Sequence, residues 1–256
     1  SWVMLSPVLA YLVRPWLYEN VSPATLDANI TWESFLEPAT LLADVLFTGF
    51  YPVVQWMSYL LIGLLIGRLR LGELPVQVGL VAAGIVAAAG AKFLSYYLLL
   101  EEGGLDALLA TDSGRIWPLA RMMEVNLAGV EQTGSWWWLA VSGPHSGTPL
   151  DLLHSAGTAA AVVGVCLLLT RARPNLLLPL SAAGAMTLTL YSLHVWAMSV
   201  TDAQPVPPDP MVLFWVSAAA AAGIGIAFNK LGSRGPLEIV THGASQLVRH
   251  GSLSGK

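Results

Sequence analysis

The segment GPHSGTPLDLLH, which ends at His154, carries the densest set of side chains that could do chemistry. His145 and His154 stand on either side of Asp151. An imidazole can move protons near neutral pH, and a carboxylate can orient an acceptor by a hydrogen bond. Ser146 or Thr148 suits the cap of a helix here, and Asp151 suits its first turn. Capping leaves the two histidines unexplained, so His145, His154 and Asp151 are candidates for catalysis or acceptor positioning.

Two more ionisable side chains lie within long apolar runs, where a charge is costly and usually has a role. Lys92, with Tyr96 on the next turn, could bind a phosphate or a carboxylate; the alternative is that it extends to the outer lipid headgroups. His194 lies three residues after Tyr191, so both share one helix face. It is a candidate proton shuttle, with a hydrogen-bonded packing role as the alternative.

The polar stretch 101–149 adds three substrate-binding candidates. Arg121 and Glu124 could complete a polar pocket. Trp137 belongs to a run of three tryptophans, which is an anchor at the membrane interface or, alternatively, a wall of a lipid or sugar site. The sequence has no P-loop, GxSxG, HExxH or dinucleotide motif, and the histidine spacing matches no metal-ligand pattern, so no metal is expected.

The composition indicates a membrane protein. Apolar residues make up 55% of the 256 residues and charged residues 11%, with a mean hydropathy of +0.64. Soluble domains carry about a quarter charged residues. A net charge of −4 gives no reason to expect a nucleic-acid partner, and the single cysteine excludes a disulfide within the chain.

The apolar runs predict an all-α fold, a polytopic transmembrane bundle of about six spanning helices with large extracytoplasmic loops. A span needs about 20 apolar residues. Five segments meet this length, and a sixth, shorter and containing two prolines, begins the chain: 46–67, 76–100, 150–170, 176–200, 211–228 and 2–18. Large outer loops then cover 19–45 and 101–149. The bundle occupies 1–230, and 231–256 form a cytoplasmic tail.

The basic residues orient the bundle. Three pairs fall on one side if the spans alternate: Arg68 and Arg70, Arg171 and Arg173, Lys230 and Arg234. Such clusters mark the cytoplasmic side. We therefore expect a protein of the plasma (inner) membrane with a cytoplasmic C-terminus.

Three local expectations complete the prediction. Small residues at 79–90 and in the last two spans favour close helix packing. A short helix is expected at 115–127 in the second outer loop. An amphipathic helix is expected at 237–248 in the tail.

Four segments together resemble bacterial polytopic membrane proteins of the YeiB-like and heparan-α-glucosaminide N-acetyltransferase-like superfamily, above all its actinobacterial members. They are the run FYP…W…GLLIGRL from Phe50 to Leu69, PHSG from Pro144, PLSAAGAMTLTLY ending at Tyr191, and GPLE ending at Glu238. The resemblance covers roughly residues 47–238. The family's N-terminal half, with its early Arg-Gly helix and its catalytic histidine, has no counterpart here, so the chain is expected to be the C-terminal part of a longer protein.

The resemblance implies a transmembrane acyltransferase, which takes an acyl group from cytoplasmic acyl-CoA, its co-substrate, to an extracytoplasmic glycan or glycolipid. His145, His154 and His194 are then candidates for positioning the acceptor. Arg68 and Arg70 are candidates for contacts to the phosphates of the acyl-CoA, although the orientation rule also explains them. The catalytic residue itself cannot be carried over.

Two other functions stay open. A non-catalytic subunit of a larger cell-envelope complex would fit the incomplete catalytic motif. A small-molecule or lipid transporter would fit Lys92 and His194, but the sequence shows no clear repeat and no pair of broken helices. Membrane lipids are expected partners in each case, and a homo-oligomer or a larger complex is left open.

Overall fold

A computed structural model describes residues 2–21, 32–116, 118–127, 130–204 and 208–253. The regular secondary structure of these residues is helical, and they contain no strand. This confirms the all-α class. The chain forms two compact units, Ser1–Leu168 and Leu169–Lys256, each described here by itself. The predicted division between bundle and tail concerns the membrane and stays a prediction.

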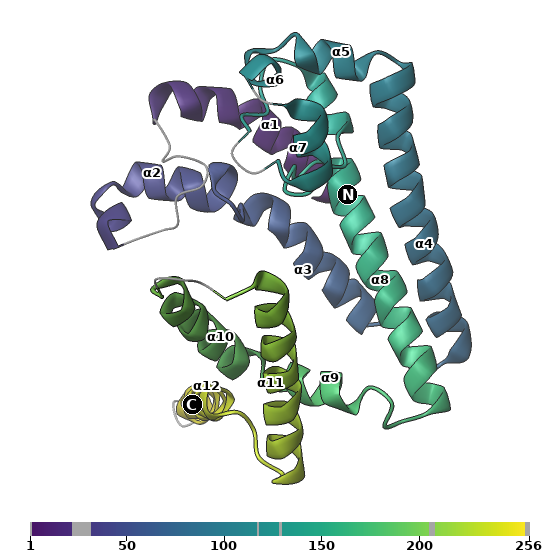
Figure 1. The fold of residues 1–256 in the computed structure, drawn as a ribbon, viewed down its shortest axis with the longest axis vertical. Helices are drawn as coiled ribbons and strands as arrows, with labels where there is room; N and C mark the ends of the chain where they lie inside the picture. Colours follow the sequence, from purple (N-terminus) through teal and green to yellow (C-terminus); the bar gives the residue numbers. More distant parts are fainter. Residues whose placement is uncertain (1, 22–31, 117, 128–129, 205–207, 254–256) are drawn as a thin grey trace. The chain divides into compact units, whose positions relative to one another are not determined.

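Three helices of the described chain are long and apolar enough to cross a membrane (Figure 1). They are α4 (Leu74–Tyr96, extended by the π-helical η3, Tyr97–Glu101), α8 (Pro149–Ala172) and α11 (Pro210–Lys230). All three fall on predicted spans. A fourth exists if one bent helix pair counts as a single span, so the predicted number of six is not confirmed.

A bend of 46° interrupts the span predicted at 46–67. The chain runs through η1 (Trp32–Leu36), α2 (Pro38–Ala43) and the π-helical η2 (Asp44–Thr48), breaks at 49–52, and resumes as α3 (Val53–Gly67). A continuous helix here was therefore a wrong prediction. Pro52 offers no backbone N–H and adopts an extended conformation. The turn also needs Gly49, because a Cβ there would lie 2.5 Å from the carbonyl oxygen of Asp44.

A second break interrupts the span predicted at 176–200, and this continuous helix was also wrong. The chain forms α9 (Leu178–Gly184) and then α10 (Thr187–Asp202). Glu238 of α12 (Pro236–Leu253) contacts the first turn of α10. Its carboxylate accepts hydrogen bonds from the Thr189 amide at 3.1 Å and from the Thr189 hydroxyl at 2.5 Å. The predicted tail helix is confirmed as α12.

The first helix, α1 (Trp2–Asn20), is not among the helices apolar enough to span a membrane. It packs on α3 through polar contacts. The buried hydroxyls of Ser6 and Ser58 lie 3.3 Å apart, and the Trp2 indole N–H donates to the Val54 carbonyl at 2.9 Å. Of the predicted outer loop 19–45, residues 22–31 lie outside the described part, and 32–45 are mostly helical.

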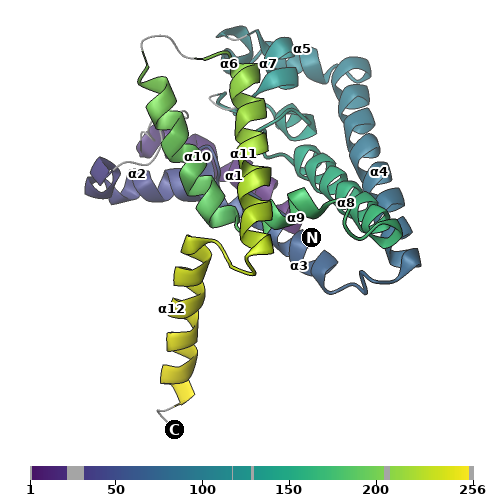
Figure 2. The same ribbon diagram turned by 60° about the horizontal axis from the view of Figure 1, so that its bottom comes forward.

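Small residues allow close helix contact, as predicted. A Cβ at Gly84 of α4 would lie 2.5 Å from the Ala161 amide of α8, and one at Gly157 would lie 2.7 Å from the Ala88 amide. Figures 1 and 2 show α4 and α8 side by side. In the second unit, a Cβ at Gly225 of α11 would lie 2.6 Å from the Ala183 amide of α9.

The loop 101–149 packs around a hydrophobic core that it shares with Leu99 of η3 and Tyr11 of α1. Four short helices compose the loop: α5 (Gly104–Leu109), α6 (Asp112–Ile116), α7 (Leu119–Val125) and the 3-10 helix η4 (Trp136–Ala140). The single helix predicted at 115–127 was wrong, because Pro118 separates α6 from α7. Trp138 is fully buried at the centre of this core. Its indole N–H donates to the Thr133 carbonyl at 2.9 Å, so Trp138 is not an interfacial anchor.

Candidate functional site

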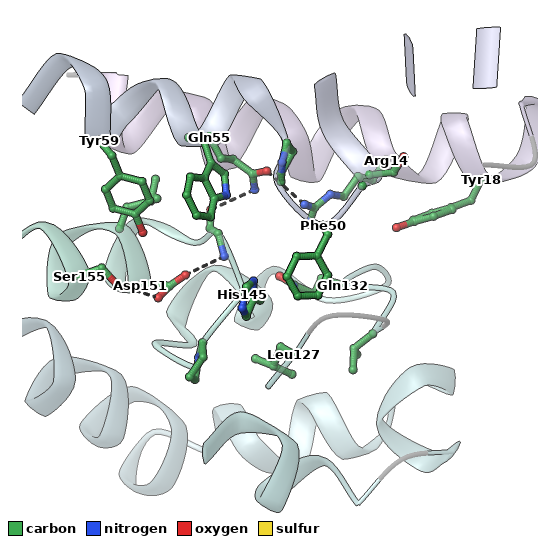
Figure 3. Close-up of a pocket in the computed structure, with 18 residues that line it drawn as sticks. Arg14, Tyr18, Phe50, Gln55, Tyr59, Leu127, Gln132, His145, Asp151 and Ser155 are labelled. Carbon is green, nitrogen blue, oxygen red and sulfur yellow. Dashed lines mark hydrogen bonds between the residues drawn. The ribbon is translucent and has the colours of Figure 1, made fainter. Parts of the chain in front are cut away.

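The first helix break opens onto a cavity of about 320 Å³ (Figure 3). The break itself lines one side through Gly49, Phe50 and Pro52. Polar side chains come from four parts of the first unit: Arg14 and Tyr18 of α1, Gln55 and Tyr59 of α3, Gln132 and His145 of the loop, and Asp151 of α8. The cavity therefore gathers residues from across the first 155 positions.

A chain of hydrogen bonds crosses the cavity wall and fixes these parts together. The Arg14 Nη2 donates to Gln55 Oε1 at 3.3 Å, and Gln55 Nε2 donates to the Gly147 carbonyl at 3.0 Å. The Gly147 amide then donates to Asp151 Oδ2 at 3.0 Å. Gln55 is 1% exposed, so breaking either of its bonds would leave a buried amide unpaired, at about 1–3 kcal/mol.

Asp151 holds the loop at the beginning of α8. Its second oxygen accepts a bond from the Ser155 hydroxyl at 3.5 Å, and its side chain is buried. Its amide donates to Thr148 Oγ1 at 3.1 Å, which confirms Thr148 as the predicted helix cap. The Thr148 hydroxyl in turn donates to the Val141 carbonyl. Asp151 thus positions the loop that carries His145.

Among the residues that the structure describes, His145 is the one residue other than glycine that has a positive φ, at 61°. This left-handed conformation costs free energy for a residue with a Cβ, and such strain gathers at functional sites. The exposed imidazole packs against Phe50, with ring centroids 4.4 Å apart, and lies 6.0 Å from the Tyr51 ring. The strained backbone thereby keeps the ring at the break, where it lines the cavity (Figure 3).

The other two candidate histidines do not line this cavity. His154 is half-buried, and its Nδ1 lies 3.0 Å from the Ala88 carbonyl of α4, so it helps to join α8 to α4. His194 and Tyr191 are exposed on α10 in the second unit. The structure therefore brings His145 together with Asp151 and leaves His154 and His194 outside the cavity.

A second cavity, of about 170 Å³, collects three predicted substrate-binding residues: Lys92, Tyr96 and Glu124. The Lys92 ammonium donates to the Ser142 carbonyl at 2.9 Å and lies 6.0 Å from the Tyr96 ring centroid. Lys92 thus joins α4 to the loop. Arg121 is exposed and does not line this cavity.

The remaining candidates lie elsewhere. Trp137 packs over Gly104 in the loop core. Arg68 and Arg70 are exposed just beyond the C-terminal end of α3, and Arg70 pairs with Glu73 at 3.1 Å. Arg68 follows Tyr59, the last residue of α3 that lines the cavity, by nine positions, so at about 1.5 Å per residue it lies about 14 Å farther along the helix axis.

Sequence reasoning missed Arg14, Gln55 and Tyr59. Arg14 carried a usable signal, since it is the only Lys or Arg among the first 67 residues and lies in an apolar run. The two others gave none, because a glutamine and a tyrosine in a helix reveal no partner. Among the described residues, no group of three His, Cys, Asp or Glu side chains is placed to hold a metal ion.

Comparisons with family models, with curated proteins and with solved structures find no match for this chain. The functional argument therefore depends on the residues of the chain and on the cavity that they form.

Proposed function

We propose that the chain is a membrane acyltransferase, or part of one, which transfers an acyl group from acyl-CoA to a glycan or glycolipid hydroxyl. One observation supports this most. Two motif segments of the resemblance, FYP from Phe50 and PHSG from Pro144, are 94 positions apart (144 − 50) and line the same cavity. The motifs thus converge on one polar site that can receive an acceptor.

His145 is the proposed general base at this site. Its imidazole takes the proton of the acceptor hydroxyl, and the hydroxyl oxygen attacks the acyl carbonyl carbon. The carbon–sulfur bond of the thioester then breaks, and coenzyme A leaves as its thiolate, which takes the proton from the His145 imidazolium and becomes the free thiol. Asp151 and Gln55 act as positioning residues, since they hold Gly147 and so the loop of His145.

The two ends of α3 suit different parts of this reaction. The cavity adjoins its N-terminal end, and the exposed Arg68 and Arg70 follow its C-terminal end. Arg68 would contact the coenzyme A phosphates in the cytoplasm, and the cavity would face the extracytoplasmic side. The C-terminus would then be cytoplasmic and the membrane the plasma (inner) membrane, as the basic clusters predict.

The test uses the full-length protein in proteoliposomes with labelled acyl-CoA and cell-envelope glycans or glycolipids as acceptors. We expect release of the free thiol together with label in the acceptor. His145→Ala should lower the rate about 100-fold, the usual lower range for a lost general base, without changing the unfolding temperature. His242→Ala, on exposed α12, is the matched control. Absence of transfer to every acceptor, or a fully active His145→Ala, would reject the proposal.

Transport is the second candidate, because the structure holds two broken helices that the sequence did not reveal. Broken helices often form the substrate sites of transporters. The first break here lines a polar cavity. Solute flux into proteoliposomes without acyl-CoA, abolished by Arg14→Gln, would favour transport over acyl transfer.

A further inference from the structure

We infer that the cavity at the first helix break binds an anionic ligand, with a phosphate or carboxylate group held by Arg14 and Tyr18. This inference rests on the proposed function and names its acceptor class, a sugar-sized molecule that carries such a group. The cavity of about 320 Å³ lies at the lower end of the range for small-molecule sites, so it fits one sugar unit better than a long glycan.

The first step is the hydrogen bonding of Arg14. Its Nε donates to the Phe47 carbonyl at 3.0 Å and its Nη2 to Gln55 Oε1 at 3.3 Å. A guanidinium has five N–H donors, so these two bonds fix its plane and leave further donors for a ligand. The fork geometry of the guanidinium matches the oxygens of a carboxylate or a phosphate.

The second step is the charge around Arg14. Among the residues that the structure describes, no carboxylate forms an ion pair with this half-buried guanidinium. Gln55, the side chain that accepts a hydrogen bond from it, is neutral. A cation removed from water without a counter-charge is costly, and an anionic ligand would supply that charge.

The third step is the direction of the side chains. Arg14 and Tyr18 are four residues apart on α1 and so lie on one face. Figure 3 shows the polar ends of both directed into the cavity. A tyrosine hydroxyl can donate a further hydrogen bond to an anion bound at the guanidinium.

The other wall of the cavity carries a hydrogen-bond acceptor, a carboxylate, where the Arg14 wall carries a cation. Asp151 lies there with Ser155 and Tyr59, all three lining the cavity. A carboxylate accepts hydrogen bonds, so this wall suits a hydroxyl or an amine. His145 adjoins the same loop and could take a proton from that hydroxyl. The two walls would therefore orient a ligand with its anionic group at Arg14 and its hydroxyl toward His145.

The test measures binding to the full-length protein in detergent, without acyl-CoA, by calorimetry and by the shift of the unfolding temperature. The probes are glucose 6-phosphate, glucuronate and the neutral sugar glucose. We expect at least one anion to bind at least 10-fold more tightly than glucose. The two anions distinguish a phosphate from a carboxylate.

Matched variants locate the effect. Arg14→Gln should weaken the tighter anion about 10- to 100-fold, the range for a lost hydrogen bond to a charged group. Tyr18→Phe, which removes only a hydroxyl, should weaken it a few-fold. Arg115→Gln, at an exposed arginine of α6 that does not line the cavity, should leave binding unchanged. If Arg14→Gln does not fold, Tyr18→Phe still decides, because unchanged anion binding in that variant counts against the site.

Several outcomes would overturn the inference. They are equal binding of glucose and both anions, no binding of either anion, or an equal loss in Arg115→Gln and Arg14→Gln. The result also separates this inference from the proposed function. Anion binding without any acyl transfer rejects only the acyltransferase, whereas acyl transfer that prefers neutral sugars rejects only the anionic acceptor.

Discussion

The helix break at 49–52 in the first unit and the one at 185–186 in the second interrupt apolar segments in different ways. The first depends on local residues, Gly49 and Pro52, and leaves its own side chains in the wall of a cavity. The second depends on a residue far along the chain. There the Glu238 carboxylate accepts hydrogen bonds from the amide and the hydroxyl of Thr189 at the start of α10.

The difference indicates how to separate a functional break from a structural one. Helix breaks expose backbone groups that need partners. At the second break the protein supplies those partners itself, and the Gly235 backbone adds to the closure, since a Cβ there would lie 2.7 Å from the Thr189 hydroxyl. At the first break the wall includes Arg14, which has no carboxylate partner in the described residues. We expect substitutions at the first break to change function and those at the second to change only stability.

The largest expected effect compares the two breaks directly. His145→Ala should lower acyl transfer about 100-fold, because it removes the proposed base, and should leave the unfolding temperature unchanged. Thr189→Val should lower the unfolding temperature, because it removes a hydroxyl that both donates to Glu238 and accepts from the Leu237 amide. Activity per folded molecule should stay at the level of the unaltered protein. Equal loss of activity in both variants would remove the distinction.

The next effect concerns the loop that carries His145. Gly147→Ala should destabilise the protein by about 3 kcal/mol, because φ is 62° and the new Cβ would lie 2.6 Å from Gln55 Nε2. Gly134→Ala is the control, since φ is 79° but the nearest atom lies 3.8 Å away, so it should cost only about 1–2 kcal/mol. Chemical unfolding in detergent measures both. Equal losses would show that the contact with Gln55 contributes nothing.

A smaller effect is expected in the second unit. Gly225→Ala should destabilise by about 2 kcal/mol, because its Cβ would meet the backbone of α9, which cannot move aside without separating the helices. Gly223→Ala, two residues earlier on α11, meets nothing within 4 Å and should stabilise by about 0.5–1 kcal/mol. Unfolding curves of the two variants check this pair, and a neutral Gly225→Ala would count against close packing of α9 and α11.

The smallest expected effect is a dependence of stability on pH at the second break, which Glu238 closes by accepting hydrogen bonds from Thr189. The hydrogen bond from the Thr189 hydroxyl lowers the pKa of Glu238 below its ordinary value of 4.5. The ionised carboxylate therefore contributes stability above pH 4.5, and this contribution is lost as the pH falls through the lowered pKa. Glu238→Gln should unfold at a lower temperature than the unaltered protein at pH 7, and the gap should narrow below pH 4.5. A gap independent of pH would contradict the role of the charge.

The sequence predicted the long helices well and the breaks poorly. Apolar runs define α4, α8 and α11, since nothing inside them competes with the helix. Hydropathy averaged over a long window did not reveal the break at Gly49 and Pro52, although glycine and proline are both signals of a turn. The second break could not be found at all, because its partner Glu238 lies 49 positions from Thr189.

The candidate site shows the same limit. His145 and Asp151 were found because they lie close together in the sequence, and the cap at Thr148 followed from its position before the helix. Arg14 and Gln55 enter the cavity only through the packing of α1 and α3, which no local pattern specifies. His154 was grouped with His145 by spacing, but the helix turns it to the Ala88 carbonyl instead.

Thiol labelling tests the contrast between the two breaks most directly. The background variant Cys166→Ser removes the only native cysteine. Single cysteines then replace His145 at the first break and Thr189 at the second. The purified variants react with a maleimide under native conditions and after unfolding. We predict that His145→Cys reacts at close to the rate of the unfolded chain, and that Thr189→Cys reacts at least 10-fold more slowly than when unfolded. Equal protection of both cysteines would contradict an accessible first break and a second break that is closed by Glu238.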